Sequence, residues 1–214
     1  MRIIPWFWHL ANSAAKVVTG LRLSTRVVSV FDAGDAGSLG ARWVHALAWD
    51  SSLGTFVSFG GRDAANVYNN DTLIWNGTAW EPAASDMLPP ARTDHAMCSA
   101  PGGGLLLFGG RGSDGQLLND TWLFQAGQWT PVLTLHAPGL RGGHAMAFDR
   151  SRNAVVLFGG FTASGSPAYY GDTWTFDGDD WVLASQIGPT SRFAHSMAYD
   201  PARQAVVLFG GYNG

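Results

Sequence analysis

The sequence predicts an all-β repeat protein, and three observations support this prediction. The stretch Arg192–Gly211 is repeated with small changes at Arg42–Gly61, Arg92–Gly110 and Arg141–Gly160. The histidines of the four copies stand 50, 49 and 51 residues apart. Each copy contains short apolar runs bounded by Gly, Asp, Asn and Pro, which favour strands joined by tight turns. A period near fifty with this punctuation is typical of a repeat architecture.

The composition agrees with short, densely packed strands and excludes several classes of protein. With 46% hydrophobic and 14% charged residues, the 214-residue chain has the composition of neither a disordered segment nor a coiled coil. The net charge of −3, with no basic block, gives no electrostatic support for a nucleic-acid partner. A single cysteine excludes an intrachain disulfide framework. No apolar run approaches the roughly eighteen residues of a membrane span.

Residues 1–40 lack the diglycine signature and form a divergent N-terminal segment. Residues 1–15 match an export signal only in part, because Pro5 and His9 interrupt the short apolar run. We therefore favour a divergent N-terminus over a cleaved export signal. A signal would place the protein outside the cytoplasm, and the sequence leaves both locations open. Residues 21–40 contain one strand pattern followed by a turn signal, which makes them a candidate partial repeat.

From residue 41 each repeat resolves into four short strands. The first begins at the histidine, as in His144–Asp149, and a polar turn follows it. The second is an unbroken apolar run such as Ala154–Phe158, which indicates a strand buried on both faces. The third opens with Asp-Thr and the fourth with Trp, and the dipeptides Asn76-Gly77 and Asp177-Gly178 are typical of the hairpin between them. The predicted blades are 41–91, 92–140, 141–191 and a partial 192–214.

This unit resembles the kelch repeat, the unit of kelch-type β-propellers including the central domain of galactose oxidase. The motifs that carry the resemblance are Arg-x-x-His-Ala-Met-Ala-aromatic-Asp, Val-Val-Leu-Phe-Gly-Gly and Asp-Thr-Trp-x-Phe, in a variant similar to bacterial kelch-like repeats. The resemblance covers residues 41–214 and implies a propeller of about 3.5 recognisable blades. The copper ligands of galactose oxidase are not reproduced as a motif, so its activity is not carried over.

Three explanations of the incomplete blade count stay open, because kelch propellers usually close with six or seven blades. We favour a fragment of a longer gene product, which would make this a partial propeller. Residues 21–40 would alternatively close a four-bladed ring, the smallest propeller size. Two chains would otherwise complete one ring, and an unclosed propeller invites self-association through its bare faces.

The four Arg-x-x-His pairs first suggest catalysis or a metal ring. A residue repeated in every blade is more simply structural, and we expect the arginine and histidine to bond turn carbonyls or a neighbouring carboxylate. The expected carboxylates are Asp71, Asp120 and Asp172. Catalytic residues, metal and cofactor are therefore each predicted as none.

Two further kinds of repeated position also have a structural interpretation. Cys98 stands where other copies have alanine and is expected to be a small, inert, buried residue. The tryptophans that open the fourth strands, Trp80, Trp129 and Trp181, are expected to pack between blades. The diglycines lack the strand–GxGxxG–helix context of a nucleotide site.

Function is expected in the loops after the diglycines, where residues are not repeated. Aromatic, Arg and Asp side chains on adjacent loops are typical of a binding face. The candidate ligand-binding residues are Arg62, Asp63 and Tyr68, then Arg111 and Asp114, and finally Phe161, Tyr169 and Tyr170. The resulting hypothesis is a non-catalytic module that binds an unknown protein or glycan. The alternatives are a fragment of a galactose-oxidase or sugar-isomerase type enzyme with its catalytic residues elsewhere, and a structural spacer of a larger surface protein.

Overall fold

The computed structural model describes residues 41–162 and 169–213. The named secondary-structure elements within these residues are all β-strands. Because no helix occurs in these residues, none of them forms a helix able to cross a membrane. The predictions made for residues 1–15 and 21–40 lie outside the described residues.

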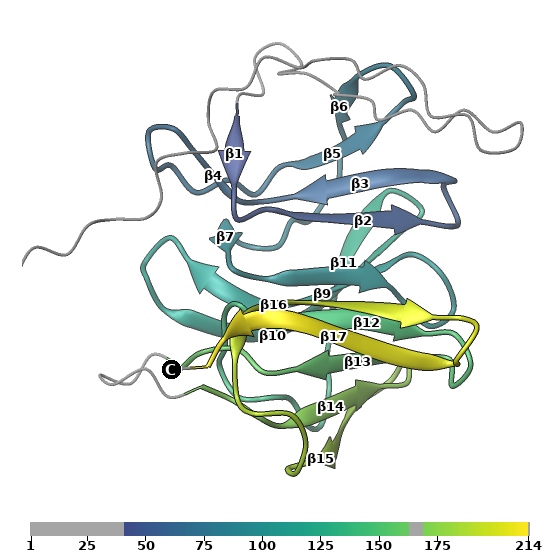
Figure 1. The fold of residues 1–214 in the computed structure, drawn as a ribbon. Coiled ribbons are helices and arrows are strands. Elements are labelled where there is room, and N and C mark those ends of the chain that lie inside the picture. The colour runs from purple at the N-terminus through teal and green to yellow at the C-terminus, as the bar shows by residue number, and fades with distance from the viewer. Residues whose placement is uncertain (1–40, 163–168, 214) are drawn as a thin grey trace, which may run out of the picture. The chain divides into compact units, whose positions relative to one another are not determined.

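Three four-stranded antiparallel blades follow one another along the chain, and a two-stranded hairpin follows them (Figure 1). Blade 1 has the order β2 (Ala46–Asp50), β3 (Thr55–Phe59), β5 (Thr72–Trp75) and β6 (Trp80–Pro82). Blade 2 has β8 (Ala96–Ser99), β9 (Leu105–Gly112), β10 (Leu117–Gln125) and β11 (Gln128–Val132). Blade 3 has β12 (Ala145–Asp149), β13 (Ala154–Phe158), β14 (Thr173–Phe176) and β15 (Trp181–Ser185). The hairpin, called blade 4 below, is β16 (Phe193–Asp200) and β17 (Ala205–Tyr212).

Short strands at the arginines add to this pattern. β1 (Arg42–Trp43) pairs with β4 (Arg62–Asp63), and β7 (Arg92–Thr93) pairs with the end of β9. The four-strand repeat is therefore confirmed in blades 1 to 3. In blades 1 and 2 the arginine that precedes the histidine is therefore paired with the segment that follows the diglycine.

An aspartate ends each first strand of blades 1, 3 and 4 and holds the turn that follows. Oδ1 of Asp50 accepts hydrogen bonds from the backbone amides of Ser52 and Leu53, at 2.8 and 3.2 Å. Asp149 and Asp200 accept the corresponding pairs in blades 3 and 4. Side-chain oxygens of Asp favour such turns because they supply the acceptor that the backbone lacks there.

The hairpins predicted at Asn76-Gly77 and Asp177-Gly178 form, but with four-residue loops. Oδ1 of Asn76 accepts hydrogen bonds from the amides of Thr78 and Ala79, which widens the turn beyond two residues. The two-residue loop occurs in blade 2, where Ala126 and Gly127 have φ values of 51° and 82°. These angles match the turn type that suits the twist of a hairpin.

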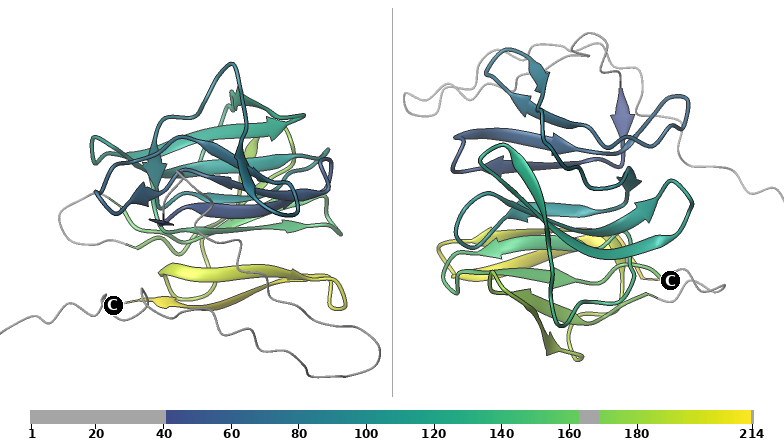
Figure 2. Two further views of the ribbon diagram at one scale, coloured as in Figure 1. Left: turned by 90° about the horizontal axis from the view of Figure 1, so that it is seen from above. Right: turned by 180° about the vertical axis from the view of Figure 1, so that it is seen from behind.

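The core lies between consecutive blades. Strand residues Leu105–Phe108 of β9 are completely buried, as the unbroken apolar run predicts. One apolar cluster joins Val57 and Phe59 of blade 1 to Met97 of blade 2, and a second joins Phe108 to Met146 of blade 3. Strand β16 lies beside β12, so blade 4 follows the same order of packing (Figure 2).

Two of the repeated tryptophans bridge neighbouring blades, as expected. The indole Nε1 of Trp129 donates to Oγ1 of Thr72 at 2.8 Å, and that of Trp181 donates to Oγ1 of Thr121 at 2.9 Å. Both rings are buried. Trp80 of blade 1 is only half-buried and contacts Trp75 within its own blade.

The last apolar run is an exception to the predicted burial. In β17 the side chain of Phe209 is 83% exposed and that of Val207 is 49% exposed. The expectation that this strand is covered on both faces is therefore wrong for the described residues, because no described blade follows blade 4.

Candidate functional site

In blades 1 to 3 the repeated arginine forms a partly buried ion pair with an aspartate of the same blade. Both terminal nitrogens of Arg92 bond the carboxylate of Asp120, at 2.6 and 2.7 Å, and the same guanidinium donates to the carbonyl of Gly109. The pairs Arg42–Asp71 and Arg141–Asp172 repeat this geometry. The predicted structural role of the arginines and their aspartate partners is confirmed.

In blades 2 and 3 the guanidiniums of Arg92 and Arg141 lower the pKa values of Asp120 and Asp172 against the opposing effect of burial. Burial alone would raise the pKa of Asp172, but the hydrogen bonds and charge of Arg141 outweigh it and hold that pKa below its usual value. In blade 4, Arg192 donates to the carbonyls of Thr190 and Gly210. The aspartate position that would follow Gly211 at the same spacing falls past residue 214.

The repeated histidines have no aspartate partner in the described part of the chain, and the carbonyls they approach belong to the preceding blade: the backbone of Phe59, Phe108 and Phe158 favours the protonated rings of His95, His144 and His195. These contacts are weak, because among the described residues neither ring nitrogen of His95, His144 or His195 has a partner at full hydrogen-bond geometry. Each ring instead packs edge-on against the phenylalanine that ends the second strand of the preceding blade. The pairs are Phe59–His95, Phe108–His144 and Phe158–His195, with centroids 5.5 to 5.6 Å apart.

Burial keeps these histidines neutral. Desolvation, assisted by the nearby Arg92 guanidinium, lowers the pKa of His95 to about 3. The same two causes, with Arg192 as the cation, lower the pKa of His195 to about 4. Within the described residues, no three His, Cys, Asp or Glu side chains gather as a metal site requires. The rings of His95, His144 and His195 therefore fill the space between consecutive blades.

Acid is expected to destabilise the fold through these rings. Because their pKa values lie below the unfolded value of 6.5, the unfolded chain binds more protons between pH 6 and 4. Stability is then full above pH 6.5 and falls with pH by about 1.4 kcal/mol per unit for each buried histidine. Denaturant unfolding at pH 4, 5 and 6 should show a shallower dependence for His95→Gln than for wild type. The exposed His136→Gln is the control, and an unchanged slope in His95→Gln would contradict the assignment.

The diglycines leave room for these histidines. A Cβ built on Gly110 would lie 2.8 Å from Cβ of His95 in the same blade and 2.5 Å from the carbonyl oxygen of Thr93. A Cβ on Gly109 would lie 3.3 Å from Cε1 of His144 in the next blade. The amide of the second glycine also bonds the next blade, because that of Gly110 donates to the carbonyl of Arg141 at 2.9 Å. The sequence predicts that another chain segment approaches the Gly-Gly backbone closely. At Gly109-Gly110 the approaching residues are Thr93 and His95 of the same blade and Arg141 and His144 of the next.

The first strands of all four blades line a cavity of about 550 Å³. Its walls include Met97, Cys98, Met146 and Tyr199. Cys98 is half-buried at the position of the alanines in other blades, and burial raises the pKa of its thiol. A thiol with a raised pKa is a poor nucleophile, which agrees with the inert role expected.

The candidate binding residues lie where the second strands end, an edge called the diglycine-loop face below. In blade 1, the Arg62 guanidinium lies 5.4 Å from the centroid of the Trp43 ring. The backbones of Arg62 and Tyr68 form an isolated antiparallel β-bridge. Oδ1 of Asp63 accepts hydrogen bonds from two backbone amides of its own loop. Oδ1 of Asp114 in blade 2 accepts one from Gln116. Both aspartates thus shape the loops that carry them.

The remaining candidates meet across blades 2 to 4. The Arg111 guanidinium lies 5.3 Å from the centroid of Phe161, and Phe161 packs edge-on against Phe193 at 5.5 Å. Tyr169 contacts both Phe193 and Tyr212. We call Arg111, Phe161, Tyr169, Phe193 and Tyr212 the aromatic cluster. Tyr212 is 55% exposed, and the other four are half-buried.

Tyr170 is separate from this cluster. Its ring lies 3.9 Å from the guanidinium of Arg141, and its hydroxyl is directed to the carbonyl of Leu140. The ring therefore covers a buried ion pair and takes part in the scaffold.

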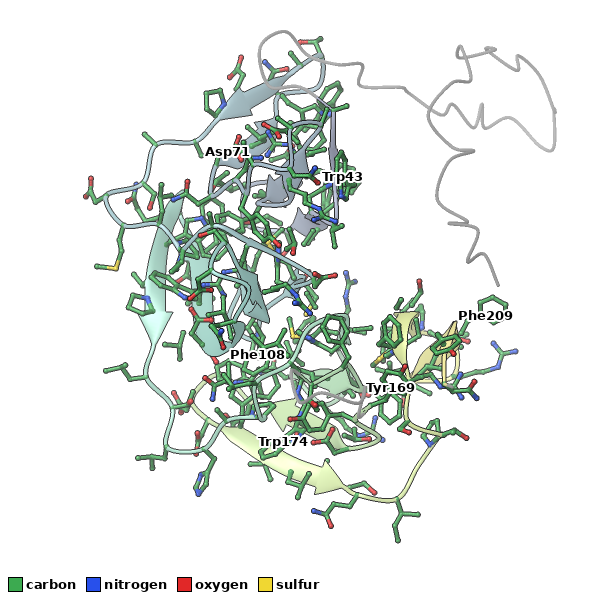
Figure 3. The ribbon with its side chains drawn as sticks, turned by 90° about the vertical axis from the view of Figure 1, so that its left-hand side faces the viewer. Trp43, Asp71, Phe108, Tyr169, Trp174 and Phe209 are labelled. Carbon is green, nitrogen blue, oxygen red and sulfur yellow. The ribbon has the colours of Figure 1, made fainter. Side chains whose placement is uncertain are left out.

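Three aromatic residues of the diglycine-loop face were missed from the sequence: Trp43, Phe193 and Tyr212. Trp43 and Phe193 follow the repeated arginine, and the other copies have Thr93 and Gly142 there. Their departure from the repeat is the signal that would have found them. Trp43 and Tyr169 are labelled in Figure 3.

Comparison with known proteins agrees with this architecture. Residues 44–213 match a family model described as the KLHDC2/KLHL20/DRC7 Kelch-repeats domain. No curated protein matches the chain.

Proposed function

Because the chain belongs to the kelch-repeat family, whose domains are typically binding modules, we propose that it binds a protein partner on its diglycine-loop face. The observation that carries the proposal is the aromatic cluster. Most of the repeated residues of blades 2 and 3 are buried in the scaffold, whereas the non-repeated aromatic residues gather at one edge and keep part of their surface in solvent. Half-exposed aromatic rings beside arginine are the usual anchors of protein interfaces.

The charged side chains of the diglycine-loop face indicate which kind of partner it would bind. Arg62 and Arg111 each lie beside an aromatic ring, and no ion pair among the described residues neutralises either guanidinium. The carboxylates of Asp63 and Asp114 each accept amides of their own loops. We therefore expect a peptide segment with an apolar anchor flanked by an acidic side chain.

Selection from a random peptide display library tests the proposal. Selected peptides should bind Tyr212→Ser and Arg111→Gln at least about tenfold more weakly than wild type, since interface anchors contribute about 2 kcal/mol or more. Leu135→Ser, at a side chain 91% exposed and outside this edge, should bind like wild type. Thermal melts would show that each variant is folded.

Two results would count against a protein partner. Peptides that bind the two variants as well as wild type would place the interface elsewhere. Ligands found only on a glycan array, with binding lost in Tyr212→Ser, would favour the glycan alternative, because exposed aromatic rings also suit sugar faces.

A further inference from the structure

The residue before each repeated histidine has a left-handed backbone. These residues are Val44, Asp94, Gly143 and Ala194, with φ values of 58°, 57°, 65° and 54°. Positive φ is uncommon for residues with a Cβ, and Asp and Asn adopt it more readily than most. In blades 2 to 4 backbone hydrogen bonds join consecutive members, because the amide of Gly143 donates to the carbonyl of Asp94 and that of Ala194 to the carbonyl of Gly143, both at 2.8 Å. We call the four residues the pre-histidine row.

Asp94 adjoins the aromatic cluster on the diglycine-loop face. The first strands run antiparallel to the second strands, so the row, which precedes the first strands, lies at the edge where the second strands end. Thr93, the neighbour of Asp94, is paired with Arg111 in the sheet of blade 2. A Cβ on Gly142 would lie 3.2 Å from Cβ of Asp94 and 2.9 Å from Cζ of Phe161. Asp94 therefore lies beside both Arg111 and Phe161.

The carboxylate of Asp94 is not neutralised by the scaffold. Asp94 is half-buried and is the charged member of a row that otherwise contains Val, Gly and Ala. Among the described residues, its carboxylate accepts a hydrogen bond only from Oγ1 of Thr93, at 2.9 Å, and no cation lies within ion-pair distance. In the same blade, by contrast, both oxygens of Asp120 are bonded by Arg92. A cation brought by a ligand would therefore meet an unpaired negative charge at Asp94, in partly desolvated surroundings that strengthen their attraction.

We propose that Asp94 binds a basic side chain, lysine or arginine, of the peptide segment whose apolar anchor occupies the aromatic cluster. This inference rests on the proposed function and adds a specificity-determining residue to it. Arg111 and Asp94 lie on the same blade without pairing, so each keeps its charge for the ligand. The diglycine-loop face then recognises three features of one peptide: an apolar anchor at the aromatic cluster, an acidic group at Arg111 and a basic group at Asp94. Such charge complementarity contributes chiefly to specificity.

Asp94→Asn tests the inference, because it removes the charge and keeps the shape of the side chain. Asparagine also tolerates positive φ and can accept the hydrogen bond from Thr93, so the variant should melt like wild type. Peptides selected on wild type from a random display library should carry Lys or Arg at a constant distance from the apolar anchor. Such a peptide should bind Asp94→Asn about tenfold more weakly than wild type.

A second peptide and a second variant serve as controls. The same peptide with methionine in place of its basic residue should bind wild type and Asp94→Asn alike, because the charge that Asp94 contacts is gone. Asp179→Asn makes the same change of net charge in the exposed hairpin between β14 and β15. It should bind the basic peptide like wild type.

The outcomes separate this inference from the proposed function. Selected peptides that require Tyr212 and Arg111 but bind Asp94→Asn like wild type, or that lack a basic residue, would overturn the inference and leave the proposed function intact. An equal loss in Asp179→Asn would overturn it by showing that net charge is responsible. A lower melting temperature of Asp94→Asn with unchanged binding would contradict it and assign Asp94 to the scaffold. Selected peptides that require neither Tyr212 nor Arg111 would overturn both proposals.

Discussion

Arg141→Met is expected to destabilise the chain by about 3–5 kcal/mol, because it leaves a partly buried carboxylate without its cation. Arg141 is completely buried, and its guanidinium bonds both oxygens of Asp172 and the carbonyls of Gly139 and Gly159. The aliphatic stem of methionine fills much of the space but satisfies none of these acceptors. Urea unfolding at pH 7, followed by circular dichroism, measures the loss.

Arg203→Met is the matched control for this prediction. Arg203 also pairs with an aspartate, Asp200, but its side chain is 78% exposed. An exposed pair contributes about 0–1 kcal/mol, so this variant should unfold almost as wild type does. Equal losses in the two variants would contradict the structural role of the buried arginines.

Gly110→Ala is expected to lower the free energy of unfolding by about 2–5 kcal/mol, through backbone strain and overpacking together. Gly110 has φ of 101°, a conformation that residues with a Cβ rarely adopt. The new Cβ would also lie 2.5 Å from the carbonyl oxygen of Thr93 and 2.8 Å from Cβ of His95, and neither can move without shifting the backbone.

Gly103→Ala separates the two causes. Gly103 has almost the same φ, 97°, but a Cβ there would meet nothing within 4 Å. Only the backbone strain of about 1–2 kcal/mol is then expected. If both alanine variants lose the same stability, the close contact with His95 is not what requires glycine at position 110.

The blades could be predicted from the sequence because the same strand pattern recurs in each repeat unit. The run Leu105–Phe108 predicts a strand covered on both faces, and its repetition predicts the neighbouring blades that cover it. The pairing of Arg92 with Asp120 was also accessible, since both recur in every complete unit and carry opposite charges.

What the sequence could not show depends on contacts between blades. His95 was expected to bond a turn carbonyl or a carboxylate, but its surroundings are the ring and backbone of Phe59 and a glycine of the preceding blade. The aromatic cluster likewise joins Arg111 to Phe161 and Phe193 across three blades. Neither arrangement follows from the spacing of residues within one repeat.

The repeated motif connects consecutive blades, and amide hydrogen exchange tests this connection most directly. The amides of Gly61, Gly110 and Gly160 each donate to the arginine carbonyl of the following blade at 2.9 Å. Gly211 stands in the same motif, with no following blade among the described residues. At a concentration where the chain is monomeric, the first three amides should be strongly protected from exchange and that of Gly211 should exchange fast. Equal protection of all four, or fast exchange of all four, would contradict the connector role.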